Sequence, residues 1–219
     1  MKIHLWGTDF RRSSAELRKK LALSPEERAQ KLNDLIRLGF KDVVYLWTCN
    51  RVEFYTTAED YFSDTRPLWL SVLKNFGLSE EDYYRGYHFE GKSALRHLMR
   101  VASSLESMVV GEPQILGQLK SAIGFNRENN LPIDKHLEQC FHLSFETAKK
   151  VRTESMRLVL ENGEEIEITY PEDIIEGLFE EMREAQTRDG FWNVGNYTQA
   201  RAMYKGCRID DVNMKRVIG

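Results

Sequence analysis

Residues 42–57 read DVVYLWTCNRVEFYTT. Two runs rich in β-branched and aromatic residues, 43–48 and 52–57, lie on either side of a polar turn at Cys49, and this pattern predicts two strands joined at the cysteine. Side chains two positions apart in a strand point to the same side, so we expect Arg51 beside Cys49. Sites often lie at strand ends of α/β and α+β sheets, so the stretch predicts both part of a sheet and a candidate site.

Two interpretations of Cys49 are open from these residues alone. As a nucleophile it would react as the thiolate, and a cation such as Arg51 would raise the thiolate fraction at neutral pH. Arg51 could instead bind a substrate carboxylate through a two-pronged hydrogen bond. The alternative is that Cys49 is a small buried apolar residue, which is the commonest fate of a single cysteine.

The elements around this stretch predict an α+β fold. A capping box at Ser24-Pro25-Glu26-Glu27 opens a helix that ends at Gly39. The full expected order is a strand at 3–7, a helix from Ser13 or Ser14 to Leu21, the helix ending at Gly39, the strands 43–48 and 52–57, a helix at 68–76 and a strand at 84–89. This βαββαβ order is the ferredoxin-like arrangement. Additional helices are expected at 93–107, 112–128 and from 134 to about 154.

Composition indicates a globular protein of the cytoplasm. The chain has 219 residues, 42% of them apolar and 30% charged, and it has no apolar run near the ~18 residues of a membrane helix. Its first residues predict a strand rather than a signal peptide. The three cysteines, Cys49, Cys140 and Cys207, are too few and too scattered for a disulfide framework or a zinc site, so we expect a reducing compartment.

The net charge of −3 does not by itself predict nucleic-acid binding. The negative charge lies mainly after residue 155, where 13 acidic residues face 8 basic ones, so any RNA contact would need a local basic patch. Lys149, Lys150 and Arg152 form one such group. The alternative for this trio is an ordinary solvated helix face.

Three ordered blocks resemble glutamyl-tRNA reductase. Residues 97–118, HLMRVASSLESMVVGEPQILGQ, look like the signature of that family, and residues 48–55 look like its cysteine motif. Residues 148–155, AKKVRTES, are similar to the end of its catalytic domain. The resemblance covers residues 1–155, implies a ferredoxin-like catalytic domain for them, and stops at Ser155.

The resemblance also implies a site. In it, Cys49 is the nucleophile and His97 poises the thiol or a proton transfer. The glutamyl group would be surrounded by Thr48, Asn50, Arg51, Ser107, Glu112, Pro113, Gln114 and Gln118. A polar lining suits glutamate, because a site that pairs both its ammonium and its carboxylate rejects analogues that lack either.

Some of these residues have a simpler interpretation from sequence alone. A single histidine in a helix, as His97 is expected to be, is more often a satisfied core or surface group. Glu112 and Gln114 precede or open a helix, where capping explains them.

The implied chemistry is attack of Cys49 on the ester of glutamyl-tRNA to form a thioester. The full-length family then reduces the thioester with NADPH to glutamate 1-semialdehyde, for tetrapyrrole synthesis. No Gly-x-Gly-x-x-Gly follows a strand in this chain, and the region after Ser155 is too short for a dinucleotide fold. We therefore expect this chain to bind no cofactor and not to reduce the thioester alone. Two alternatives are a non-catalytic regulator that binds glutamyl-tRNA or a protein, and NADPH supplied by a separate chain.

Two positions depart from the family pattern. Ser104 stands where glycine is usual, and residues 8–13 read TDFRRS in place of a motif containing His-Lys. The altered loop could affect substrate closure or tRNA placement.

Residues 156–219 are unlike this family, and they predict a small α+β module. A hairpin is expected around Asn162-Gly163, followed by an acidic helix whose apolar stripe is Ile174, Ile175, Leu178, Phe179 and Met182. An aromatic-rich region at 191–206 and a strand at 209–218 would follow. We interpret the module as an interaction or self-association unit, and the abrupt join at 155–156 also fits a gene fusion or an engineered chimera.

Overall fold

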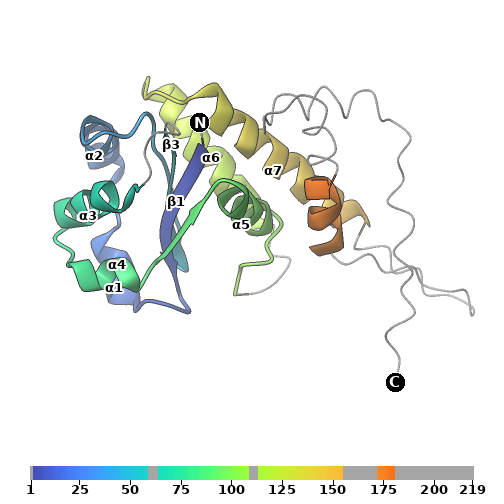
Figure 1. Cartoon of the computed structure of the whole chain (residues 1–219), viewed down its shortest axis with the longest axis horizontal. Coiled ribbons are helices and arrows are strands. Elements are labelled where there is room, and N and C mark those ends of the chain that lie inside the picture. Colours follow the sequence, from blue (N-terminus) through green and yellow to red (C-terminus); the bar gives the residue numbers. More distant parts are fainter. Residues whose placement is uncertain (1, 59–63, 109–112, 155–171, 181–219) are drawn as a thin grey trace, which may run out of the picture.

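The computed structural model describes residues 2–58, 64–108, 113–154 and 172–180 (Figure 1). The elements in chain order are β1 (Lys2–Asp9), α1 (Ala15–Lys20), α2 (Pro25–Arg37), β2 (Val44–Trp47), β3 (Arg51–Ala58), α3 (Arg66–Asn75), α4 (Glu80–Tyr84), β4 (Tyr87–Glu90), α5 (Lys92–Ala102), α6 (Gln114–Glu128) and α7 (Lys135–Glu154). Residues 172–180 form one more helix. The mixture of helices with one sheet confirms the α+β class.

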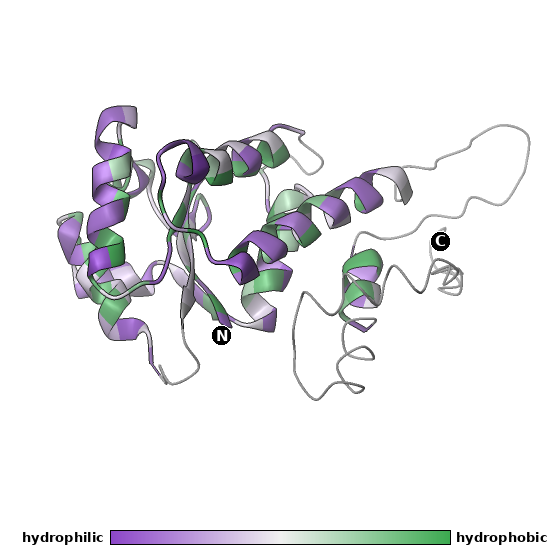
Figure 2. Ribbon diagram, turned by 90° about the horizontal axis from the view of Figure 1, so that it is seen from above, coloured by the Kyte–Doolittle hydropathy of each residue, from purple (hydrophilic) through white to green (hydrophobic). Residues whose placement is uncertain are grey.

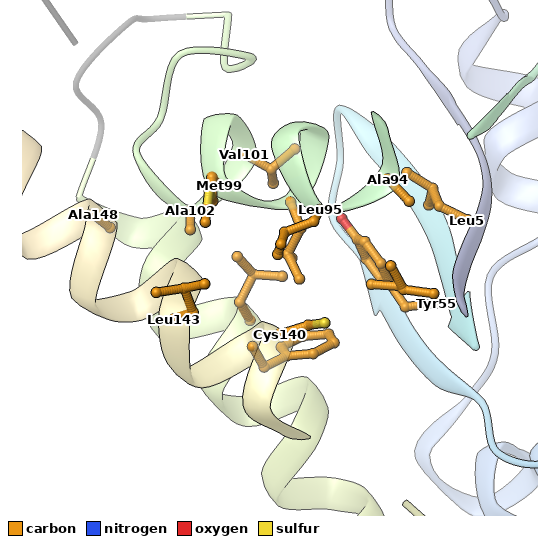
Figure 3. Close-up of a cluster of buried hydrophobic side chains, with 14 of the residues drawn as sticks. Leu5, Tyr55, Ala94, Leu95, Met99, Val101, Ala102, Cys140, Leu143 and Ala148 are labelled. Carbon is orange, nitrogen blue, oxygen red and sulfur yellow. The ribbon is translucent and has the colours of Figure 1, made fainter. Parts of the chain in front are cut away.

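The sheet has four strands in the order β2-β3-β1-β4, and every neighbouring pair is antiparallel. Helices α1 to α4 lie on one side of it and α5 to α7 on the other (Figure 1). Because side chains alternate along a strand, β3 contributes to both sides. Val52 and Phe54 join the core beneath α1–α4, whereas Tyr55 joins the core beneath α5–α7 (Figure 3).

Several boundaries differ from the predicted ones, and two of the differences have a clear local cause. The last strand was expected from Tyr84, but β4 begins at Tyr87 because Ser79 and Asp82 form a capping box that opens the short helix α4. The helix expected at 93–107 ends at Ala102, since Ser104 adopts a left-handed backbone with φ 65°.

The helix at 172–180 packs against the family-like part of the chain. Ile174, Ile175, Leu178 and Phe179 are buried in the same core as α5–α7, and Figure 2 shows both hydrophobic (green) and hydrophilic (purple) parts of this helix. Its polar edge pairs with α5 through Glu176 and Arg96 at 2.8 Å and through Glu172 and Arg100 at 2.9 Å.

The other features expected in the tail, including the hairpin, the region 191–206, the strand 209–218 and Met182, lie outside the described residues. Of the helices that the structure describes, none combines the length and apolar character needed to cross a bilayer.

Candidate active site

Cys49 lies at the tip of the turn that joins β2 to β3. The Thr48 hydroxyl accepts hydrogen bonds from the backbone N–H groups of Asn50 at 3.2 Å and Arg51 at 3.0 Å, so the threonine side chain fixes the turn locally. The Cys49 thiol is free and the residue is exposed. Interpreting Cys49 as a buried packing residue is therefore wrong. Cys140 is the packing cysteine, since it is fully buried and burial raises the pKa of its thiol.

The segment between β1 and α1 holds this turn from one side. The backbone N–H of Phe10 donates to the carbonyl of Asn50 at 2.8 Å, and Nε of Arg18 donates to the carbonyl of Cys49 at 3.2 Å. Arg18 is only 8% exposed. Sequence reasoning missed it, although a signal existed, because Arg18 lies next to Leu17 on the buried side of α1.

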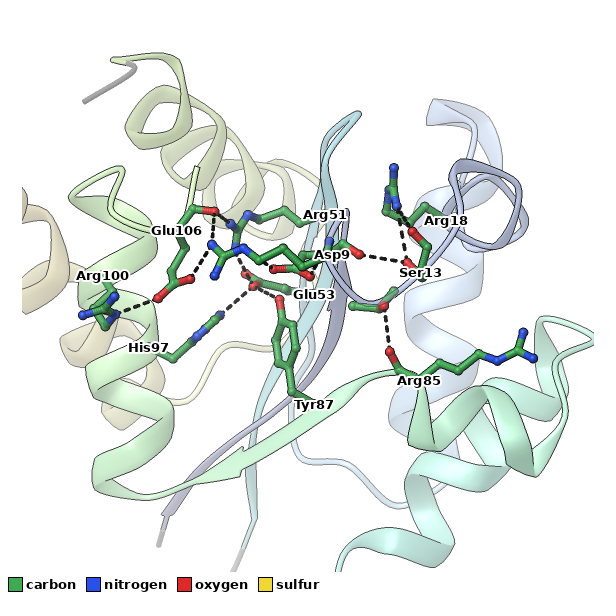
Figure 4. Close-up of polar contacts among 12 residues, drawn as sticks. Asp9, Ser13, Arg18, Arg51, Glu53, Arg85, Tyr87, His97, Arg100 and Glu106 are labelled. Carbon is green, nitrogen blue, oxygen red and sulfur yellow. Dashed lines mark hydrogen bonds and ion pairs between the residues drawn. The ribbon is translucent and has the colours of Figure 1, made fainter. Parts of the chain in front are cut away.

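A buried carboxylate organises the residues that follow the turn. Four side chains surround Glu53, which is fully buried, and Figure 4 shows three of them converging on it. Its carboxylate accepts hydrogen bonds from Arg51 at 2.9 Å, His97 Nε2 at 2.7 Å, and the hydroxyls of Tyr55 and Tyr87 at 2.5 Å each. We call these five residues the Glu53 cluster.

The Glu53 cluster keeps its carboxylate ionised. Burial raises the pKa of Glu53, but the charges of Arg51 and His97 and the hydrogen bonds from His97 and Tyr55 outweigh it, so the pKa lies well below the usual value. Burial and the Glu53 charge raise the pKa of Tyr55 and Tyr87 well above the usual value, so both phenols remain donors. An ionised Glu53 therefore places a proton on Nε2 of His97.

A second carboxylate extends this network. An Arg51 N–H donates to the backbone carbonyl of Glu106. The Glu106 carboxylate accepts from Nε of Arg100 at 2.7 Å and from Arg11 at 2.8 Å. Burial raises the pKa of Glu106, but Arg100 in particular lowers it below the usual value. The two carboxylates thus join β3, α5 and the loop before α1. Arg51 uses two of its five N–H donors in these contacts.

The structure brings only part of the predicted set together. Arg51 and His97 meet through Glu53, and Ser107 directly follows Glu106 and is half-buried. Pro113 caps α6. Gln114 and Gln118 lie exposed one helical turn apart, and within the described residues neither side chain bonds to the Glu53 cluster. Glu112 lies outside the described residues.

Ser104 occupies a strained backbone position just before this network. It is fully buried and follows α5 with φ 65°, a conformation that glycine adopts without steric cost. The geometry explains why glycine suits this position. The resulting turn leads the chain from α5 to Glu106.

Comparison with known proteins identifies the family. The family model for the glutamyl-tRNA(Glu) reductase N-terminal domain matches residues 6–155. This chain belongs to the glutamyl-tRNA reductase family. The resemblance found in the sequence is thus confirmed, and the match ends at the residue where that resemblance stops.

The relatives are considerably longer than this chain. It is 39% identical over 157 residues to a glutamyl-tRNA reductase of Pseudoalteromonas translucida, covering 71% of this chain and 37% of that protein. It is 40% identical over 150 residues to one of Ectopseudomonas mendocina, covering 68% and 35%. This member of the glutamyl-tRNA reductase family therefore spans roughly a third of the length of these curated relatives.

A solved structure shares the fold. Glutamyl-tRNA reductase from Methanopyrus kandleri superimposes with a TM-score of 0.57 at 24% identity, covering 85% of this chain and 39% of that one.

Proposed function

We propose that this chain carries out the acyl-transfer half of the glutamyl-tRNA reductase reaction, in tetrapyrrole synthesis. Sγ of Cys49 attacks the ester carbonyl of glutamyl-tRNA; a C–S bond forms, the C–O bond to the ribose breaks, and the ribose oxygen takes up a proton. The observation that carries the proposal is the exposed thiol on a fixed turn, directly before the strand that bears the Glu53 cluster.

His97 is proposed as the group that holds or moves the proton. Its Nε2 is held by Glu53, and its ring lies 4.9 Å from that of Tyr87 and 5.2 Å from that of Phe89, measured between centroids. These contacts fix the orientation of the imidazole, which suits a proton carrier near a reacting sulfur.

We propose that the glutamyl group is bound by the polar residues that the family motifs point to. The N–H donors of Arg51 that do not bond to Glu53 or Glu106 would pair with the carboxylate of the glutamyl group. The other members of this set are Thr48, Asn50, Ser107, Glu112, Pro113, Gln114 and Gln118.

We propose that the described residues do not carry out the reduction of the thioester. The family uses NADPH, but the described sheet is antiparallel throughout and therefore offers no parallel βαβ unit to hold a dinucleotide. We propose that the described residues bind no NADPH, and that a further part of a longer protein or a separate chain supplies it.

Three further assignments rest on the same proposal. We assign the sheet to the ferredoxin-like fold, supported by its strand order β2-β3-β1-β4. We place the protein in the cytoplasm. Residues 156–219 are proposed to act as a separate module that binds another protein or a second copy of this chain. The helix at 172–180 buries its apolar stripe within the chain. The proposed contact would therefore use other parts of the module.

The test is release of glutamate from glutamyl-tRNA. The thioester should hydrolyse slowly without a reductant, so the wild type should release glutamate faster than the uncatalysed rate. Cys49→Ser should lose this activity, whereas the matched control Cys140→Ser should keep it. Release that is undiminished in Cys49→Ser would rule out the nucleophile. Absence of release from the wild type, together with retained tRNA binding, would favour the non-catalytic regulator.

A further inference from the structure

The turn at Cys49 separates two faces of the sheet. Arg51 and Glu53 lie on the side of Tyr55, beneath α5–α7, because they alternate with Val52 and Phe54. Trp47 lies two residues after Tyr45 and opposite Val52, and both of these belong to the core beneath α1–α4. Trp47 therefore points to the face opposite the Glu53 cluster, with Cys49 between the two.

Trp47 is the exposed aromatic residue nearest to Cys49 in the chain. Its exposed fraction is 49%, whereas Tyr45 on the same face is almost fully buried. β2 is an edge strand of the sheet, so none of the described strands covers its outer side. Trp47 is the last residue of β2 and Cys49 follows it by two positions, so their Cα atoms lie at most about 7 Å apart, a distance that one nucleotide can span.

Positive charge lies beside the same turn. The segment 10–20 contacts the turn through Phe10 and Arg18. Exposed side chains in this segment include the basic residues Arg11, Arg12, Lys19 and Lys20, against one acidic residue, Glu16. Arg11 is paired with Glu106, and Arg12 donates to the carbonyl of Gly86 at 3.1 Å and lies over the Tyr87 ring, which leaves Lys19 and Lys20 facing solvent. This local excess contrasts with the net charge of −3 for the whole chain.

We propose that Trp47, Lys19 and Lys20 form the surface that receives the 3′ end of the acyl-donor RNA. The terminal adenine stacks on the Trp47 indole, and the adjoining phosphates lie against Lys19 and Lys20. The glutamyl ester then reaches around the turn to Cys49, and the side chain of the glutamyl group points to the Glu53 cluster. This inference rests on the proposed function and adds the nucleotide side of the same site.

The first test is a double-mutant cycle between Trp47 and the terminal adenosine. Binding of uncharged tRNA is compared with binding of the same tRNA lacking its terminal adenosine. In the wild type and in Trp47→Phe, removal of the adenosine should weaken binding by about 10-fold. Trp47→Ala should bind the two RNAs equally. Tyr84→Ala is the matched control, since Tyr84 is another exposed aromatic residue, and it should behave as the wild type. An undiminished adenosine effect in Trp47→Ala would overturn the stacking assignment.

The second test measures the salt dependence of tRNA binding. The double variant Lys19→Gln/Lys20→Gln should reduce the slope of log affinity against log salt by about 1.4, because each single-strand phosphate that a lysine neutralises adds ~0.7 to that slope. Lys149→Gln/Lys150→Gln on α7 is the control and should keep the wild-type slope. The opposite result would move the RNA site to α7 and overturn the proposal.

These results are separable from the nucleophile assignment. Alkylation of Cys49 by iodoacetamide should be the same in Trp47→Ala and in the wild type. An adenosine effect that depends on Trp47, with glutamate release that survives Cys49→Ser, would uphold the RNA surface and reject the acyl transfer. The reverse pattern would reject the RNA surface alone.

Discussion

The two ends of β3 each hold a buried carboxylate, and the two behave in opposite ways. Glu53 near the start of the strand and Asp42, which bonds to the end of the strand, are both fully buried. Glu53 faces the Arg51 guanidinium and the imidazole of His97. Asp42 accepts from neutral donors, among them the backbone N–H and hydroxyl of Thr57 at 2.7 and 3.0 Å and the backbone N–H of Asp134 at 2.8 Å.

The difference shows that the partners, rather than burial, decide the charge. Burial raises the pKa of Asp42 to about 6, and the hydrogen bonds from Asp134 and Thr57 offset only part of this effect. The pKa of Glu53 is lowered instead, chiefly because the Arg51 guanidinium lies beside it. Asp42 ties the start of α7 to the sheet, which is a structural role. Glu53 holds the histidine and arginine of the candidate site in one ionised cluster.

The largest expected effect separates the two carboxylates by stability. Glu53→Gln should lower the free energy of unfolding by about 3 kcal/mol or more, because it leaves Arg51 buried without its anion. Asp42→Asn should cost less than half as much at pH 8, since it also removes a buried charge whose hydrogen-bond donors are neutral. Urea unfolding at pH 8 measures both. Equal losses would break the distinction between the two ends of β3.

The next effect is the pH dependence of stability at Asp42. Its folded pKa of about 6 exceeds the ordinary 3.8, so the folded state binds the proton more tightly. The resulting stability is fully present below pH 3.8 and is lost as the pH rises through 6. The difference in unfolding free energy between wild type and Asp42→Asn should therefore increase by about 1.4 kcal/mol from pH 8 to pH 5.

Unfolding of the two proteins across this pH range provides the measurement, and the variant serves as the reference for all other titrating groups. A difference that is constant with pH would contradict the raised pKa. The pH dependence of stability at Glu53 has the opposite sign. The contribution of Glu53 to the free energy of unfolding is present above its ordinary pKa of 4.5 and is lost as the pH falls below that value.

The smallest expected effect is the difference of about 1 kcal/mol between two variants that each lose a single hydroxyl donor. At pH 5, Tyr87→Phe should cost about 2 kcal/mol, because its hydroxyl donates to an ionised carboxylate. Thr57→Val should cost about 1 kcal/mol, because its acceptor is then largely neutral. Chemical unfolding of both variants at pH 5 compares them. A larger loss for Thr57→Val would show that the charge of the acceptor does not set the strength of these bonds.

The parts of the fold that could be predicted are those with local causes. The β-branched runs on either side of Cys49 predicted β2, β3 and their turn, and the capping box at Ser24 predicted the start of α2. Cys49 and His97 were predicted as site residues from their positions in these elements and from the family resemblance.

The network behind the site could not be predicted in the same way. Glu53 meets His97 and Tyr87 from 44 and 34 residues away, and periodicity within one strand says nothing about such partners. Arg51 was expected to serve the thiol or the substrate, yet its nearest anion is Glu53. The one available signal was the carboxylate of Glu53 between the apolar residues Val52 and Phe54 of the predicted strand.

Mass spectrometry of the intact protein after mixing with glutamyl-tRNA tests the central claim most directly. The account predicts that one glutamyl group is added to the peptide that contains Cys49, that hydroxylamine removes it, and that Cys49→Ser does not acquire it. A wild-type protein that acquires no such adduct, or an adduct that persists in Cys49→Ser, would contradict the account.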